Sequence, residues 1–90
     1  MSRIFLVIAS FIALGFAQPA ASQIDYDNDA VYQAARAAAD SGRYDEAFPV
    51  IKRVAEDGFA KAQYNLAVLY REGRGTPASP ELYRQWMQAS

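Results

Sequence analysis

The chain has 90 residues, with nine basic and ten acidic side chains and neither histidine nor cysteine. That length allows one small domain at most. The lack of cysteine excludes a disulfide framework. The usual general base, the thiol nucleophile and the common transition-metal ligands are also missing. The composition therefore predicts a protein that is not an enzyme and that uses no cofactor or metal.

Residues 1–22 have the pattern of a secretory signal peptide. Arg3 supplies a positive charge, and the uncharged run from Ile4 to Ala17 is followed by small residues. A helix over this run reaches about 21 Å, short of the roughly 30 Å of a bilayer core, so a membrane anchor is the weaker interpretation. Small residues place cleavage after Ala17 or after Ser22, and Ser22 is preferred. We expect a periplasmic or secreted protein of bacterial type, with no stable membrane anchor after cleavage.

Charge is spread thinly over the mature chain. Removal of residues 1–22, which contain one basic and no acidic side chain, leaves eight basic and ten acidic side chains. The Lys and Arg residues are scattered rather than gathered into a run. Because a surface that tracks nucleic-acid phosphates needs a concentrated positive face, nucleic acid is not expected as a partner.

Residues 23–28 are expected to form a linker, and residues 29–58 a first, degenerate helical repeat. The Asp-Asn-Asp sequence at 27–29 offers N-cap side chains for a helix that runs to about Asp40. Gly42 suits the left-handed residue that ends such a helix. The residues between these signals are almost all good helix formers.

A second helix is expected from about Tyr44 to Asp57, with Ala47, Val50, Ile51 and Val54 buried at helical spacing. Pro49 lies inside this helix. Because proline donates no backbone hydrogen bond and clashes with the preceding turn, we expect either a loose first turn or a kink near residues 47–48.

Residues 59–90 are expected to form a second repeat. Its first helix should begin near residues 59–60 and end at Glu72. Ser79 is a good N-cap and is followed by proline, so a last helix is expected over residues 80–90. No strand-like alternation occurs outside the signal segment. The chain is therefore predicted to be all-α.

The spacing of small and large residues in this second unit is the most informative feature of the chain. Ala62, Leu66 and Tyr70 fall four residues apart on one side of a helix, a Gly-x-Gly sequence follows, and Trp86 stands in the last helix. This order resembles the Sel-one-like repeat, a relative of the tetratricopeptide repeat. The resemblance implies an α/α solenoid of about two helix–turn–helix repeats. Its scaffold positions in this chain are Ala62, Leu66, Ala67, Tyr70, Gly73, Gly75 and Trp86.

The resemblance covers residues 59–86 specifically and the earlier part of the chain loosely. A weaker internal match supports the degenerate first repeat, because Tyr32-x-Ala34-Ala35 and Tyr64-x-Leu66-Ala67 stand 32 residues apart. The two segments would then occupy equivalent places in successive repeats.

The last helix is expected to be incompletely covered. Tyr83 stands where the family has alanine, and nothing in the sequence follows to cover Leu82, Tyr83 and Trp86. Repeat architectures usually need about three units with polar terminal caps. We therefore expect either that another molecule covers this end or that the chain is the N-terminal fragment of a longer repeat protein. Replacing Trp86 by alanine is expected to cost about 3–5 kcal/mol.

The resemblance implies a protein–protein interaction scaffold or adaptor. It would bind a protein or peptide on the concave side of the array, which the first helix of each repeat forms. The residues expected to contact this partner are Lys61, Tyr64, Asn65, Val68 and Arg71. Two alternatives use the same architecture. The chain could be a self-associating structural protein, that is, a homo-oligomer, or a regulator of an exported enzyme.

Two motifs suggest ligands and are better explained by local structure. Gly73-x-Gly75 ends a helix instead of opening one after a strand, so phosphate binding is not expected. Asp25-x-Asp27-x-Asp29 starts like a calcium loop but lacks the turn glycine and the final glutamate. Helix capping accounts for these carboxylates.

Overall fold

The computed structural model describes residues 24–90; the expected signal peptide and its two cleavage sites lie outside them. A short 3₁₀ turn, η2 (Tyr26–Asn28), precedes four helices: α2 (Ala30–Asp40), α3 (Tyr44–Glu56), α4 (Ala60–Glu72) and α5 (Pro80–Ala89). The described residues contain no strand, which confirms the all-α prediction. Over the same residues, no helix combines the length and the apolar character needed to cross a bilayer.

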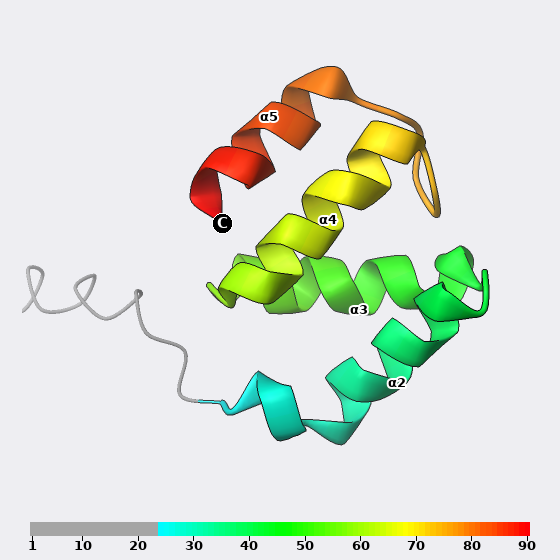
Figure 1. The fold of residues 1–90 in the computed structure, drawn as a ribbon, viewed down its shortest axis with the longest axis vertical. Coiled ribbons are helices and arrows are strands. Elements are labelled where there is room, and N and C mark those ends of the chain that lie inside the picture. The colour runs from blue at the N-terminus through cyan, green and yellow to red at the C-terminus, as the bar shows by residue number, and fades with distance from the viewer. Residues whose placement is uncertain (1–23) are drawn as a thin grey trace, which may run out of the picture.

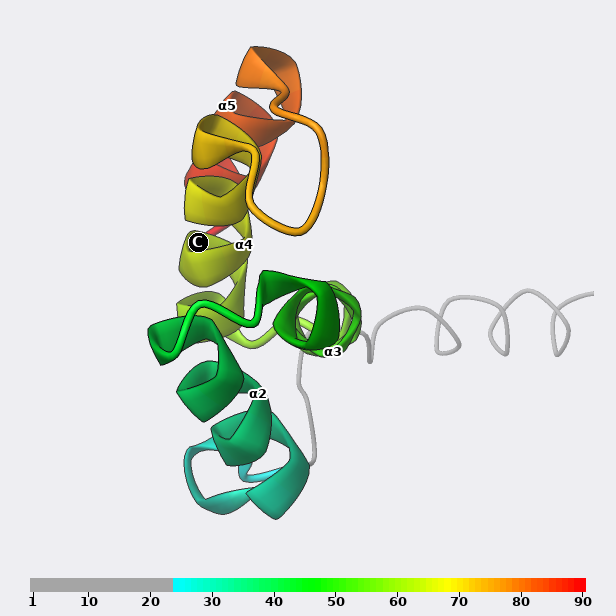
Figure 2. The same cartoon turned by 90° about the vertical axis from the view of Figure 1, so that its right-hand side faces the viewer.

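The helices stack in chain order. α2 packs on α3, α3 on α4, and α4 on α5. Figures 1 and 2 show this succession from two directions, with α2 at one end of the described fold and α5 at the other. Because each helix contacts mainly the next one along the chain, most of the packing is local in sequence.

The ends of the helices follow the local signals in the sequence. Asp29 caps α2, since its carboxylate accepts a 2.8 Å hydrogen bond from the backbone N–H of Tyr32. The hydroxyl of Ser79 caps α5 in the same way, accepting from the N–H of Leu82 at 3.2 Å. α2 ends in a left-handed Gly42 (φ 85°), which lets the next N–H reach back to the carbonyl of Ala38 at 2.8 Å.

α3 runs without interruption from Tyr44 to Glu56, with Pro49 inside it. The carbonyl that loses its partner to this proline belongs to Asp45, in the first turn. Both residues are exposed, so solvent can hydrate that carbonyl. The helix begins at Tyr44, as expected. The choice between a loose first turn and a kink near residues 47–48 stays a prediction.

Residues 24–28, the described part of the expected linker, are packed against the helices. Tyr26 is only 8% exposed and its ring lies 5.4 Å from that of Phe59 and 6.1 Å from that of Tyr32. Its hydroxyl donates a 2.8 Å hydrogen bond to Asp57, at the end of α3. This turn is packed into the fold because it carries an aromatic residue that completes the core.

The core is formed by α2, α3 and α4 together with η2. Four residues of the scaffold set, Ala62, Leu66, Ala67 and Tyr70, are buried in α4. The other buried apolar residues are Tyr26, Tyr32, Ala35, Ala38, Ala47, Ile51, Val54, Ala55 and Leu69. Val50, expected in the core, is only partly buried at its edge.

α5 contributes no fully buried residue. Trp86 is partly buried and packs against the core, as do Leu82 and Tyr83. These three side chains are therefore partly covered by the domain itself, and the coverage of α5 is incomplete. The expected loss on truncating Trp86 must also be lowered, since a half-buried side chain removes less surface from water.

The exposed side chains of α5 are polar or small. They are Glu81, Arg84, Gln85 and Gln88, with Pro80 and Ala89 at the two ends. Among the described residues, the large apolar side chains that are most exposed are Ile24, Val31 and Tyr64. Uncovered apolar surface therefore lies before η2 and on α2 and α4, whereas the exposed face of α5 is mainly polar.

Candidate binding groove

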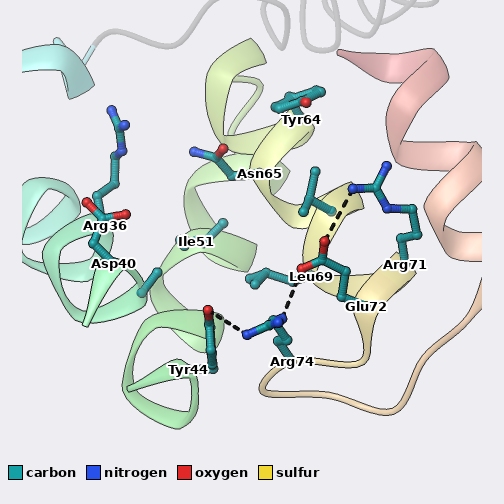
Figure 3. Close-up of a pocket in the computed structure, with 12 residues that line it drawn as sticks. Arg36, Asp40, Tyr44, Ile51, Tyr64, Asn65, Leu69, Arg71, Glu72 and Arg74 are labelled. Carbon is teal, nitrogen blue, oxygen red and sulfur yellow. Dashed lines mark hydrogen bonds and ion pairs between the residues drawn. The ribbon is translucent and has the colours of Figure 1, made fainter. Parts of the chain in front are cut away.

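A groove of about 290 Å³ opens between α2 and α4. Its floor is apolar, because Ile51 and Leu69 are buried beneath it. Ala39 and Val68 are partly buried and form the lower walls. Figure 3 shows these helices facing one another, with the polar lining residues standing around the apolar floor.

The rims carry polar side chains at helical spacing. Arg36 and Asp40 stand one turn apart on α2. On α4 the lining residues include Tyr64, Asn65 and Arg71, which fall on one side of the helix together with Val68. Tyr64 is 50% exposed, a large fraction for an aromatic side chain in a small domain. It therefore offers a contact surface at the groove rather than a core contact.

Asn65 is held in place by a residue from the first helix. Its side-chain N–H donates a 3.1 Å hydrogen bond to the hydroxyl of Tyr32, which is completely buried at its ring. No donor among the described residues reaches the amide oxygen of Asn65. That oxygen is available to an N–H group of a ligand.

One end of the groove is closed by a network of charged side chains. Glu72 pairs with Arg71 at 3.3 Å and with Arg74 at 2.9 Å. Arg74 also donates a 2.8 Å hydrogen bond to the hydroxyl of Tyr44, and its guanidinium lies 4.9 Å from the centre of that ring. The network joins the start of α3, the end of α4 and the loop after it (Figure 3).

The electrostatics of Arg71 follow from this network. The hydrogen bond to Glu72, followed by one to Tyr83, raises the pKa of Arg71. Its guanidinium also stands 5.5 Å from the centre of the Tyr83 ring. Arg71 is therefore positively charged at any physiological pH and is anchored to both α4 and α5.

A second hollow adjoins the groove and shares three of its residues. Arg36, Tyr64 and Asn65 line both, and the second hollow adds Lys61 on the first turn of α4. Lys61 pairs with Asp27 at 2.8 Å. The groove thus continues toward the start of α4.

The five side chains expected to contact a partner come together in these two hollows. Tyr64, Asn65, Val68 and Arg71 line the groove, and Lys61 lines the hollow beside it. Their role in binding stays a prediction.

Sequence reasoning missed the contribution of α2. Arg36 and Asp40 line the groove but were not expected there. A signal for them existed in the internal match at 32 residues, which makes Arg36 the counterpart of Val68 and Asp40 the counterpart of Glu72. Tyr44 and Arg74 were missed because they meet only through the tertiary fold.

The aspartates of the calcium-like motif are used locally. Asp25 accepts a hydrogen bond from Asn28, Asp27 pairs with Lys61, and Asp29 caps α2. Within residues 24–90 no cluster of acidic side chains is arranged to hold a metal ion. What the groove offers a ligand is therefore apolar contact, hydrogen bonds and ion pairs.

Comparison with known proteins finds no match to this chain among protein-family models, curated proteins or solved structures.

Proposed function

We propose that this chain is an exported helical-repeat protein of the Sel-one-like type that works as a non-catalytic scaffold or adaptor and binds a protein or peptide in the groove between α2 and α4. The observation that carries the proposal is the convergence of Tyr64, Asn65, Val68 and Arg71 on one open groove. The stacking of each helix on the next also agrees with an α/α repeat.

The groove has the composition that peptide recognition needs. Apolar residues at its floor can exclude water around one inserted side chain, and polar groups at the rim can fix the position of a bound chain. Tyr64 adds an exposed aromatic surface, a residue type that is enriched among the side chains that dominate binding energy. The amide oxygen of Asn65 can accept a hydrogen bond from a peptide N–H.

The test is a comparison of partners captured by matched variants. The purified chain, its Tyr64→Ser, Val68→Asp double variant and a Gln85→Ser control are used to capture proteins from an envelope fraction. The control changes an exposed residue of α5 that lines neither the groove nor the adjoining hollow. A partner that binds the wild type and the control but not the double variant supports the proposal. Equal capture by all three chains contradicts it, provided that circular dichroism shows the same helix content.

The same surface would serve a regulator of an exported enzyme, which differs only in the partner. If the captured protein is an enzyme and its activity changes on binding, this alternative replaces the scaffold. An unchanged activity leaves the scaffold role in place.

A second candidate, self-association, is favoured by the outer edge of α2. Val31 is 60% exposed and lies in a shallow apolar hollow with Ala34, Ala38 and Val50. Light scattering of the wild type and a Val31→Lys variant over a range of concentrations tests this candidate. A mass that rises with concentration in the wild type alone supports a homo-oligomer, and a monomer in both argues against it.

A further inference from the structure

The charges around the groove differ from those of the remaining surface. Residues 24–90 contain eight basic and ten acidic side chains. The groove and the adjoining hollow are lined by four of the basic residues, Arg36, Lys61, Arg71 and Arg74, and by two of the acidic ones. Four basic and eight acidic residues are therefore left for the rest of the domain. With Asp27, which pairs with Lys61, counted as well, four basic side chains stand against three acidic ones, so the groove keeps a positive excess on an acidic protein.

One of these charges has no counter-ion in the described part of the chain. Arg36 is exposed, lines both hollows, and makes no ion pair or hydrogen bond with another described residue. Lys61 and Arg71 have partners, but those pairs are exposed to solvent. Exposed ion pairs are weak, so an incoming carboxylate can exchange with the existing partner.

The positive side chains stand on either side of apolar surface. In Figure 3, Arg36 projects from α2 and Arg71 from α4, with Ile51 and Leu69 between them. Val68 and Tyr64 extend this apolar strip on α4. A ligand that fits both features carries an apolar side chain with carboxylates near it.

We propose that the groove selects an extended, acidic protein segment in which an apolar side chain is flanked by carboxylates. This rests on the proposed function and specifies the partner. The apolar side chain occupies the floor over Leu69, and the carboxylates pair with Arg36 on one side and with Arg71 on the other. Asp40 and Glu72 stand among the basic residues, so the groove lacks the continuous positive face that a phosphate backbone needs.

The experiment measures binding of short fluorescent peptides to the purified full chain. One peptide has glutamates around a central leucine, a second has glutamines around the same leucine, and a third has glutamates around a central serine. The first should bind at least about tenfold more tightly than either of the others, because it alone satisfies both charge and apolar contact. Its affinity should also fall as salt is raised.

The matched variants are Arg36→Glu and Arg84→Glu. Both positions are exposed, but Arg84 lies on α5, away from the groove. Arg36→Glu should weaken binding of the glutamate–leucine peptide by about tenfold or more, through loss of an attraction and gain of a repulsion. Arg84→Glu should change the affinity by less than about twofold, because Arg84 lines neither the groove nor the adjoining hollow and exposed charges interact weakly when they are not in contact.

The outcomes separate this inference from the proposed function. Equal affinity for the glutamate and glutamine peptides, or an unchanged affinity in Arg36→Glu, overturns the acidic preference. The groove would still be a binding site if its Tyr64 and Val68 variants lose a captured partner. Failure of every peptide to bind also overturns the inference. If a single-stranded oligonucleotide competes for the groove as strongly as the acidic peptide does, the ligand would be nucleic acid and not an acidic peptide.

Discussion

The two helical hairpins of this chain are held in different ways. Residues 41–43 join α2 to α3, and a Cβ on Gly42 would meet no atom within 4 Å. Residues 73–79 join α4 to α5, and a Cβ on Gly75 would lie 2.6 Å from the carbonyl oxygen of Tyr44. The first connection is a free turn. The second is pressed against the other hairpin and helps to fasten the two together.

The hairpins also differ in how deeply their aromatic residues are buried. Tyr32 in α2 is completely buried and hydrogen-bonded, whereas Trp86 in α5 is partly exposed. Trp86 is therefore the less completely buried of the two, although its side chain is the larger. Size and sequence pattern alone do not rank the contributions of aromatic residues to stability.

The largest expected effects come from removing these two aromatic side chains. Tyr32→Ala should lower the free energy of unfolding by about 3–5 kcal/mol, because it leaves a cavity in the core. Trp86→Ala should lower it by about 1–3 kcal/mol, since part of its surface is already in water. Urea unfolding of both variants checks the order. A greater loss for Trp86→Ala would show that α5 is more important to the core than its burial indicates.

The two glycines give the next comparison. Gly75→Ala should cost roughly 2–4 kcal/mol, because the left-handed conformation (φ 77°) is unfavourable for alanine and the Cβ would also lie 2.8 Å from that of Phe48. Gly42→Ala should cost about 1–2 kcal/mol, from conformation alone. Thermal unfolding of the two variants measures the difference. Equal losses would mean that the second loop is not pressed against α3.

A smaller effect on stability is expected from removing the hydrogen bond between Arg74 and Tyr44, which joins the two hairpins. Tyr44→Phe removes the hydroxyl that accepts the hydrogen bond from Arg74 and should cost about 1 kcal/mol. Tyr64→Phe is the matched control, because no described residue bonds to its hydroxyl, and it should change stability by less than about 0.5 kcal/mol. The same loss of stability in both variants would show that the hydroxyl of Tyr44 does not help to hold the two hairpins together.

The smallest effect concerns pH at the start of the first hairpin. The hydrogen bond to Asp57, followed by burial, raises the pKa of Tyr26 above its ordinary value of 10.0. The folded state then holds this proton more tightly than the unfolded chain, so the contribution is complete below pH 10 and is lost as pH rises through the folded pKa. Chemical unfolding above pH 10 should show a steeper loss in the wild type than in Tyr26→Phe. If the two proteins lose stability equally as pH rises, the proposed contribution of the Tyr26 proton is contradicted.

Much of the fold could be predicted because its signals are local. Asp29 and Ser79 cap their helices, and Gly42 and Gly73 end theirs, within about a residue of the expected positions. Pro49 is accommodated for a local reason too, since the carbonyl that it leaves without a partner is exposed.

The candidate groove could be predicted only in part. The residues on α4 came from one motif, and that motif carries the helical spacing that puts Tyr64, Val68 and Arg71 on one side. The motif does not predict that Arg36 lies beside them, because the position of Arg36 depends on how α2 is oriented relative to α4. The Tyr44–Arg74 hydrogen bond joins residues 30 positions apart, and no periodic pattern in the sequence predicts it.

The sequence by itself determined the helices, their ends and the apolar side of α4, because caps, glycines and periodicity act within a few residues. Only the tertiary structure decided that Trp86 is partly covered, that Tyr26 belongs to the core, and that Arg36 lines the same groove as Tyr64. Exposure and neighbourhood depend on the angle and depth at which helices pack. Those are set jointly by side chains distant in the sequence.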